Sequence, residues 1–468
     1  MKLRLHLLIA LLLSISGLQA QSDTLLLSYR EYLGYVKEYH PVAKQAKLVL
    51  SNAEAELLKA RGGFDPKIEV DYDQKQFKGD EYYDILNATF KVPTWYGIEL
   101  KAGFEENEGI FLNPERSVPE NGLYNAGLSV SVAQGLLIDE RRAQLRQAKF
   151  FVEQSKQDQT LLVNELLYKA SEAYFDWLQA YKQVLLQREF LVNAEQRFRG
   201  VRSSALLGDV AIIDTVEAKI PVQNRSLLLE QARIALNNKR LALSNYLWIS
   251  NNIPMEVQED VIPEETLEVT LTQTLGVSPL NTEEFDLSNH PKLLSLQYKG
   301  EALEVDRQFK ANNLLPRIDL EFNALSTTPD RTETFNSNDY KFGINASFPL
   351  FLRKERGALR MAKFKIQDNE FEQNLAQISI ANKVEALQQE LTSLREQINI
   401  NENMVNAYTQ MLNAEIRKFS FGESSVFLIN SREQKLVEAR VKQIKLEQKY
   451  YSGFAKLFQA LGITEVEL

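Results

Sequence analysis

Apolar and polar residues alternate along two neighbouring runs in the second half of the chain, residues 317–326 and 340–350. Alternation with a period of two is typical of a strand that buries one face. Between the runs stand Pro329, Asp330 and Asn336, which favour turns. The pattern predicts a hairpin with one polar, solvated face and one apolar face. The apolar positions are Ile318, Leu320, Phe322 and Ala324 in the first run, and Tyr340, Phe342, Ile344, Ala346, Phe348 and Leu350 in the second.

Four more alternating runs lie between residues 67 and 133, so we predict six strands in the chain. They are centred on Val70, Ala88, Leu100 and Leu128. Pro93 separates the second run from the third, and a polar segment, residues 107–121, separates the third from the fourth. The alternative, four strands with one elaborated loop, stays open at this point.

The remaining sequence has the periodicity of long helices, with apolar residues that recur every seven positions. We predict helices over 28–61, 140–201 and 212–249, and again over 291–313, 354–419 and 426–461. A helix of about 60 residues is about 90 Å long, far longer than a globular domain needs. The heptad positions are Val163, Ala170, Trp177, Val184, Leu191, Phe198 and Ala205, and later Val384, Leu391, Ile398, Val405, Leu412 and Phe419.

The two halves of the chain repeat one another. His40 and His290, each followed by Pro, are 250 residues apart, whereas Gly208 and Gly422 are 214 residues apart. The first half is therefore 36 residues longer, and the excess fits one extra hairpin. We predict a first structural repeat over 21–250 and a second over 289–468. The segment between them, 251–288, has nine acidic residues and no Lys or Arg, and we interpret it as an irregular acidic surface linker.

Residues 1–20 have the pattern of a signal peptide: Lys2 and Arg4 precede an apolar run, and Ala20 suits cleavage. The mature chain is therefore expected to be exported. No later run is apolar over the roughly 18 residues of a spanning helix, so we expect any membrane crossing to be made by strands. The formal net charge of −9 argues against binding nucleic acid.

The polar faces of the predicted strands carry charges, among them Asp71, Glu99, Lys101, Asp319 and Glu321, and a water-filled lumen would explain them as one set. Aromatic residues near the strand ends would suit a membrane-interface girdle, although a simple strand preference explains them equally well. They are Tyr82, Tyr83, Trp95, Tyr96 and Tyr340. The predicted fold class is mainly α with a β membrane portion, a duplicated helix-hairpin-helix whose strands join a shared barrel.

These features together resemble the TolC family of outer membrane efflux ducts. The most specific likeness lies in two segments, 208–218 and 422–430, which look like the helix-turn-helix at the periplasmic end of that family. The resemblance implies a homotrimer in the outer membrane lipid with a periplasmic helical tunnel. It also implies docking on a periplasmic adaptor (membrane fusion) protein and an inner membrane transporter. The family usually has four strands per chain, so six strands, or about 18 in a trimer, would be a departure.

The resemblance also implies where partners and a gate would lie. Adaptor docking is expected at the tips, on Gly208, Asp209, Gly422 and Glu423. Family members carry acidic gate residues six and nine positions after the second tip glycine. Those places hold Leu428 and Ser431 here, and the matching first-half places hold Asp214 and Glu217. These four are the entrance gate candidates, with a plain solvated helix face as the alternative for the two acids.

We find no sign of an enzyme. The chain has no Cys and three His, of which His6 would leave with the signal peptide. It has no phosphate-binding loop, metal-spaced His pair or nucleophile elbow, so we predict no catalytic residue, no metal and no cofactor. The predicted function is a passive duct that conducts substrates from a pump to the exterior. The alternative is a periplasmic coiled-coil scaffold without a channel.

Overall fold

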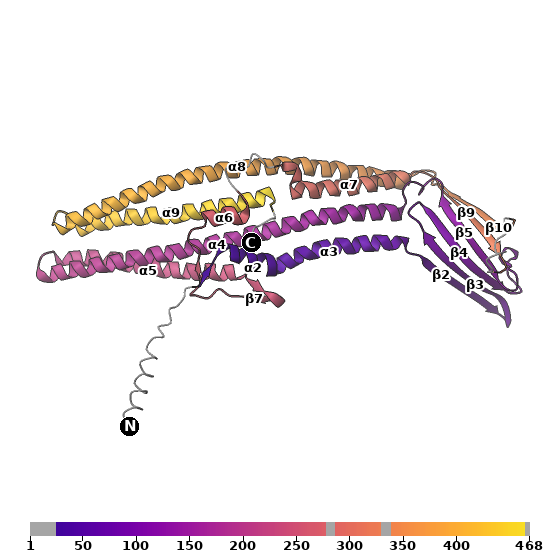
Figure 1. Cartoon of the computed structure of the whole chain (residues 1–468), viewed down its shortest axis with the longest axis horizontal. Coiled ribbons are helices and arrows are strands. Elements are labelled where there is room, and N and C mark those ends of the chain that lie inside the picture. The colour runs from indigo at the N-terminus through magenta and orange to yellow at the C-terminus, as the bar shows by residue number, and fades with distance from the viewer. Residues whose placement is uncertain (1–24, 278–285, 329–337, 464–468) are drawn as a thin grey trace, which may run out of the picture. The chain divides into compact units, whose positions relative to one another are not determined.

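The structure is a computed structural model that describes residues 25–277, 286–328 and 338–463. The predicted signal peptide and the turn residues Pro329, Asp330 and Asn336 lie outside these ranges. The fold class is confirmed: the described chain is mainly helical and carries one large sheet (Figure 1). The chain forms two compact units, one of Met1–Ala43, Val163–Glu284 and Val384–Leu468, and the other of Lys44–Leu162 and Phe285–Lys383.

The elements follow the predicted helix-hairpin-helix order twice. The helices are α2 (Tyr29–Tyr39), α3 (Pro41–Arg61), α4 (Glu140–Leu207), α5 (Ile212–Ser244), α6 (Glu268–Leu275), α7 (Pro291–Asn312), α8 (Arg353–Ser420) and α9 (Val426–Leu461). The long strands are β2 (Lys67–Phe77), β3 (Asp80–Pro93), β4 (Ile98–Glu108), β5 (Leu123–Ser131), β9 (Arg317–Ser326) and β10 (Tyr340–Ser347). Four two-residue strands complete the set, β1 (Leu26–Leu27), β6 (Trp248–Ile249), β7 (Ile253–Pro254) and β8 (Ile262–Pro263).

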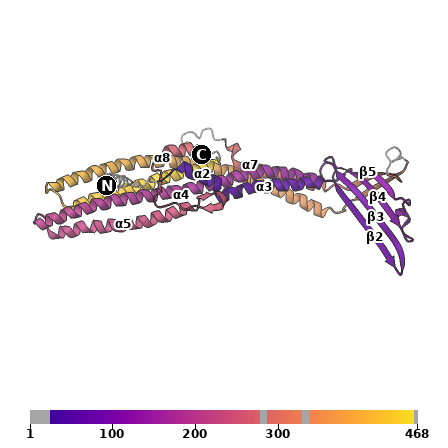
Figure 2. The same ribbon diagram turned by 60° about the horizontal axis from the view of Figure 1, so that its bottom comes forward.

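The six long strands form one antiparallel sheet in the order β10-β9-β5-β4-β3-β2 (Figures 1 and 2). This settles the strand count left open by the sequence, because the extra segments pair fully rather than forming a loop. The strands β3 and β4 lie between β2 and β5, whereas β9 and β10, which the second half provides, pair directly with one another. The inserted hairpin therefore widens the sheet by two strands.

In the first unit, parts of α4, α5, α8 and α9 pack through apolar side chains. One core cluster joins Leu186 and Phe190 of α4 with Leu412 of α8 and Ile429 and Leu436 of α9. The predicted heptad residue Leu412 lies in this cluster, and two further heptad residues, Val184 and Leu391, are buried as well. Near the N-terminal strand, Tyr29, Tyr174 and Phe175 bury their rings against one another.

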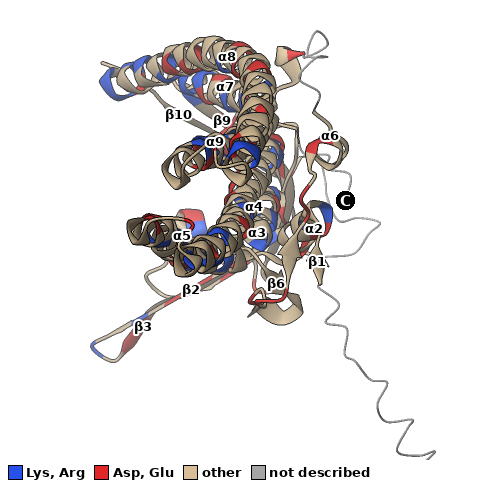
Figure 3. Ribbon diagram, turned by 90° about the vertical axis from the view of Figure 1, so that its left-hand side faces the viewer, with Lys and Arg blue, Asp and Glu red and all other residues tan. Residues whose placement is uncertain are grey.

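In the second unit, the sheet is joined to α3, α4, α7 and α8. The side chain of Ser295 on α7 bonds Asp158 on α4 at 2.7 Å, and Asn369 on α8 donates to the carbonyl of Leu296 at 3.1 Å. Gly300 permits this second approach, because a Cβ there would meet the Asn369 amide at 2.9 Å. The start of α8 is basic, since residues 353–365 hold six Lys or Arg and one Glu, whereas charges of both signs are mixed along the rest of α4 and α8 (Figure 3).

Several predicted helix ends differ from the structure. The helix predicted over 28–61 is broken at His40, which is extended because the residue before a proline disfavours helical angles. The helix predicted over 212–249 ends at Ser244, because Trp248 and Ile249 pair with β7 instead. The helix predicted over 140–201 continues to Leu207, and the strand predicted over 340–350 ends at Ser347, just before the Phe348-Pro349 pair.

The interpretation of residues 251–288 as an irregular surface linker is wrong for its described part. It contains α6, whose Leu271 and Leu275 are buried together with Leu267 just before the helix. These residues recur every four positions and make one apolar helix face, a signal that the nine acidic residues obscured. The segment is acidic outside and apolar inside, and it packs onto its unit.

Candidate functional site

The sheet has one apolar and one polar face. Because neighbouring strands pair in register, the apolar residues line up across it: Phe342 stands opposite Phe322, Phe322 opposite Leu128, and Leu128 opposite Leu100. On this face large side chains remain exposed although the sheet is complete, among them Val70, Phe90, Leu100, Phe322 and Ile344. An exposed apolar face of this extent is typical of a surface that contacts lipid or another protein.

The polar face carries cross-strand ion pairs. The Lys101 ammonium lies 3.1 Å from the Glu321 carboxylate, and Lys91 pairs with Glu69. Ser131 and Asp319 share a hydrogen bond of 2.5 Å between their side-chain oxygens. Charged groups in these contacts remain partly exposed, so the pairs suit a wet surface and contribute little to stability.

Aromatic side chains gather at both ends of the sheet. At the end near the helices, Trp95 stacks on Phe64 with ring centroids 4.1 Å apart. At the distal end, Tyr82 packs against Phe111 at 4.5 Å, and Tyr340 stacks on Phe322 at 5.7 Å. Trp95 and Tyr340 are more than half exposed, as is Tyr96. Two aromatic zones that flank an apolar band are typical of strands in a lipid bilayer.

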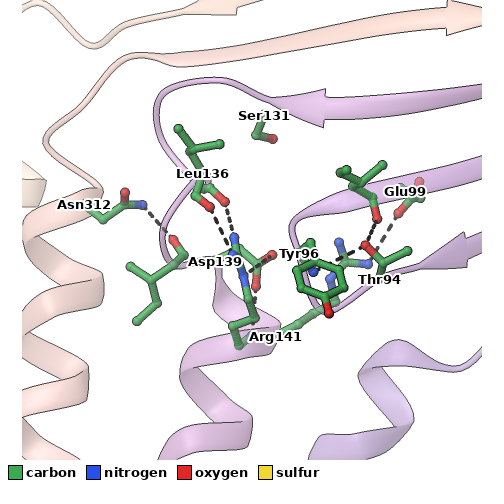
Figure 4. A network of polar contacts seen from close by, with 12 residues as sticks. Thr94, Tyr96, Glu99, Ser131, Leu136, Asp139, Arg141 and Asn312 are labelled. Atoms are coloured by element: carbon green, nitrogen blue, oxygen red, sulfur yellow. Dashed lines mark hydrogen bonds and ion pairs between the residues drawn. The ribbon is translucent and has the colours of Figure 1, made fainter.

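A network of polar contacts fixes the sheet to its helices (Figure 4). The Arg142 guanidinium donates to the carbonyls of Gly135 and Leu136 and pairs with Asp139 at 3.3 Å. Asn312 of α7 donates to the carbonyl of Ile138 at 2.9 Å. The turn from β5 into α4 is thereby held by side chains from both halves of the chain, which stabilises the joint.

The second candidate region consists of the two helix-helix turns, which we call the tips: residues 206–213 and 420–428. Gly208 has φ +86° and Gly422 has φ +78°, a conformation that strains other residues, so both predicted turn glycines are confirmed. Ser425 caps α9 by accepting from the Leu428 N–H. A small apolar cluster of Val201, Ala218 and Val426 lies behind the tips.

The docking and gate candidates lie at these tips. Asp209 follows Gly208, and Glu423 follows Gly422, with Glu423 exposed. Asp214 stands in the first turn of α5, where a carboxylate is favoured by the helix dipole, and Glu217 follows one turn later. Leu428 is 38% exposed and Ser431 is exposed on α9. The structure leaves all four gate candidates near helix starts, and their role stays a prediction.

Sequence reasoning missed a buried charged cluster behind the tips. Arg197 of α4 binds Glu433 of α9 through both terminal guanidinium nitrogens, and its Nη1 also donates to Asn430 at 3.0 Å. Glu433 is 2% exposed. It takes a place in the apolar series Val426, Ile429, Glu433, Leu436. A single charge in an apolar seam was the signal that could have revealed it.

Arg225 of α5 joins this cluster and is also buried. Its Nη2 donates to Gln434 at 2.9 Å, and its guanidinium lies over the Phe190 ring at 5.8 Å. Burial lowers the pKa of the Arg225 guanidinium, while the nearby Glu433 carboxylate opposes the shift. The cluster therefore ties α4, α5 and α9 together with charges in a dry environment, where pairing matters most.

The described residues hold no group of three or more potential metal ligands. None of the helices in the described part of the chain is long and apolar enough to span a bilayer. The described residues form a sheet with one apolar and one polar face, long helices and two exposed tips.

A family model described as outer membrane efflux protein matches residues 286–463. Over this range, the chain is similar to the outer membrane efflux protein family. The matched range takes in α7, both strands of the second hairpin, α8 and α9, so the family's pattern is clearest in the second half. The family consists of channels, and the resemblance inferred from the sequence is confirmed.

Solved channels share the fold over almost the whole chain. The CmeC outer membrane channel of Campylobacter jejuni is similar with a TM-score of 0.63 and 14% identity, covering 92% of this chain and 85% of its own. The outer membrane protein VceC of Vibrio cholerae is similar with a TM-score of 0.63 and 14% identity, and the match covers 92% of this chain and 95% of VceC. The MtrE outer membrane channel of Neisseria gonorrhoeae is similar with a TM-score of 0.64 and 14% identity, and the match covers 92% of this chain and 88% of MtrE. No curated protein matches the chain.

Proposed function

We propose that this protein is the outer membrane duct of a tripartite efflux or secretion system. It would conduct substrates passively from an inner membrane transporter and a periplasmic adaptor protein to the exterior. The observation that carries the proposal is the six-stranded sheet with one apolar face, one charged face and two unpaired edges. Such a sheet is stable in lipid only when its edges are paired, because unpaired backbone groups are costly there.

The two free edges fit one another. Every residue of β2 and of β10 is exposed in the single chain. Each neighbouring pair of strands in the sheet is antiparallel, so β2 and β10 run in opposite directions. The β10 edge of one copy can therefore pair with the β2 edge of the next as a regular antiparallel ladder. Three copies would close a barrel of about 18 strands around an aqueous lumen.

The helix α8 supports assembly from several copies. A heptad seam runs along it from Met361 through Phe364, Phe371 and Leu375 to Ile378, in steps of three and four residues once Asp368 is included. All five apolar side chains of this α8 seam are more than half exposed. An apolar heptad seam calls for a partner helix, and further copies of the same chain would supply it in a homotrimer.

The tips suit an apolar docking surface. Leu206, Leu207 and Ile212 are each about four-fifths exposed in the first-half tip, and Phe421 and Phe427 are exposed in the second. We propose that the adaptor docks here, with Gly208, Asp209, Gly422 and Glu423 shaping the turns. Asp214, Glu217, Leu428 and Ser431 are proposed to line the entrance, which would place the acidic groups of the gate in the first half rather than in the second half as in the TolC pattern.

The proposal is tested by expressing the chain in a Gram-negative host, fractionating the membranes, and measuring mass and conductance of the purified protein. We expect extraction from the outer membrane with detergent only, the mass of a trimer, and one small channel per trimer in a planar bilayer. A water-extractable protein without channel activity would contradict the duct and favour the scaffold alternative.

A further inference from the structure

A single register row of lysines crosses the polar face of the sheet. Lys341 of β10 stands opposite Asn323, Asn323 opposite Gly127, and Gly127 opposite Lys101. Lys101 in turn stands opposite Lys91, and Lys91 opposite Lys67 of β2. Four of the six strands thus place a lysine at the same level, which we call the lysine row: Lys67, Lys91, Lys101 and Lys341.

The inserted hairpin provides half of the lysine row. Lys91 lies on β3 and Lys101 on β4, the two strands that separate β2 from β5. The other two lysines lie on the edge strands β2 and β10. A sheet without the insertion would keep only these two, so the extra hairpin both widens the sheet and doubles its lysines at this level.

Carboxylates next to the row are already paired. Glu69 pairs with Lys91, Glu321 with Lys101, and Asp319 with Arg317 at 2.7 Å. Glu99 pairs with Arg141 at 3.4 Å, which leaves none of these four carboxylates for the edge lysines. Within the described ranges, neither Lys67 nor Lys341 has a carboxylate within ion-pair distance. The row therefore carries two uncompensated positive charges in each chain.

The middle of the row is open and hollow. A pocket of about 340 Å³ on this face is lined by Lys91, Lys101 and Lys341 together with Asn125 and Asn323. Two carboxylates, Glu105 and Glu321, also line it, so the three ammonium groups outnumber the carboxylates by one. Gly127 has no side chain at its centre, and a Cβ there would meet the Asn323 amide oxygen at 2.3 Å. The glycine and the asparagine leave space between the ammonium groups, which provide donors but no negative charge.

The polar face is different further along the strands. Beyond the lysine row toward the β2–β3 turn, β2 carries Asp71 and Asp73, and β4 carries Glu105 on the same face. Because Asn87 and Ile85 stand opposite the two aspartates, no basic residue of β3 compensates them in register. Lys75 of β2 and Arg317 of β9 also lie on this face, but only at the lysine row do basic residues of four strands share one level.

We propose that the lysine row binds anionic solutes, in particular small multivalent oxyanions that carry phosphate or carboxylate groups. The inference rests on the proposed function, because the polar face becomes a lumen only when three chains close the ring. Three copies then place twelve lysines at one level, with six uncompensated charges. Lysines on neighbouring strands lie about 5 Å apart, within the Debye length of about 10 Å at 0.1 M salt, so an anion beside the row would be attracted by several of them.

The test is block of single channels by inorganic triphosphate at 0.1 M salt, with the reversal potential in a KCl gradient as a second reading. The variants are Lys67→Gln and Lys341→Gln, which remove the uncompensated charges and leave no carboxylate unpaired. Lys78→Gln is the matched control, because Lys78 lies in the β2–β3 turn, outside the row. We expect each row variant to weaken block by about three- to fivefold and to shift the reversal potential toward cation preference, with Lys78→Gln unchanged.

A variant of opposite sign makes the test decisive. Glu321→Gln releases Lys101 from its ion pair and is expected to strengthen block by a similar factor. Channels whose block is the same in all variants would overturn the lysine row as a binding site while leaving the duct intact. Unchanged block in Lys341→Gln alone would also contradict it, since Asp71 or Asp73 of a neighbouring copy would then already neutralise that lysine. A protein that forms no channel would overturn the proposed function itself.

Discussion

The helices α4 and α8 take equivalent places in the two halves and both are 68 residues long, yet their apolar side chains are buried differently. On α4, Tyr174, Phe175 and Trp177 are fully buried within the chain. On α8, Phe371 is 70% exposed and the whole α8 seam has no partner in the single chain. Further along α8, Leu391 and Leu412 are buried within the chain, so only the α8 seam is left for a neighbour.

The largest effect is expected from a substitution in the α8 seam, and it is an effect on trimer formation. Phe371→Asp would place a carboxylate in the proposed contact between copies, where an unpaired buried charge is very costly. We expect the trimer to be lost while helix content is kept, as measured by native mass and circular dichroism.

The control is Gln377→Asp, which adds the same charge on an exposed face of α8 outside the seam. It should remain trimeric. Equal behaviour of the two variants would mean that the α8 seam does not join copies.

A smaller effect is expected inside the chain, where α4 is held by the buried pair of Arg197 and Glu433. Arg197→Met would leave Glu433 buried without a partner, and we expect the free energy of unfolding to fall by about 3–5 kcal/mol. Hydrogen exchange of α9 around Glu433 measures it, and adding Glu433→Met should recover much of the loss.

The exposed pair of Arg440 and Glu189 is the matched comparison, since it joins the same two helices at 2.7 Å. Arg440→Met should cost less than about 1 kcal/mol. Similar losses in both variants would show that burial does not set the strength of these pairs.

Replacing the turn glycine should destabilise the tip by a similar amount in each half of the chain. Gly208→Ala and Gly422→Ala each force a residue with a Cβ into a positive φ, at a cost of about 1–2 kcal/mol. Gly200→Ala within α4 should instead stabilise by about 0.5–1 kcal/mol, because alanine favours helix. Hydrogen exchange rates of the amides near each substitution would measure the change in local stability for all three variants. An unchanged exchange rate in Gly208→Ala would mean that the turn can relax to accept a Cβ.

The smallest effect is a pH dependence at the start of the first half. The Nδ1 atom of His40 accepts from the Val42 N–H at 3.1 Å, and burial lowers the pKa of its imidazole below the ordinary value of about 6.5. With a depressed folded pKa, the stability from this group is complete above the unfolded pKa and is lost as pH falls through the folded pKa. His40→Asn should remove that part of the acid sensitivity, as measured by thermal unfolding between pH 7 and pH 5. The same slope in both proteins would contradict it.

Much of the fold was predictable because its signals are periodic. Alternation located all six strands, and the heptads located the long helices, with the predicted bounds of α9 matching the structure. The break at His40 and the end of α5 at Ser244 were missed, because a proline effect and a two-residue strand act over too few residues to change a periodic pattern. The buried face of α6 was missed since acidic residues surround its leucines.

The candidate site was predictable only in part. The charges of the polar face were visible as one set, but the lysine row was not, because register between strands far apart in sequence decides which charges share a level. The Arg197–Glu433 pair needs the same long-range information. Sequence periodicity gives the face of a residue, and only tertiary pairing gives its neighbours.

The central claim, that the free edges of the sheet close a ring with further copies, is tested most directly by cross-linking. The chain has no cysteine, so Val70→Cys on β2 can be combined in turn with Cys at Ile344 or its neighbours on β10. We expect disulfide-linked products in the outer membrane that stop at three chains. Bonds only within one chain, or a ladder that continues beyond three, would contradict it.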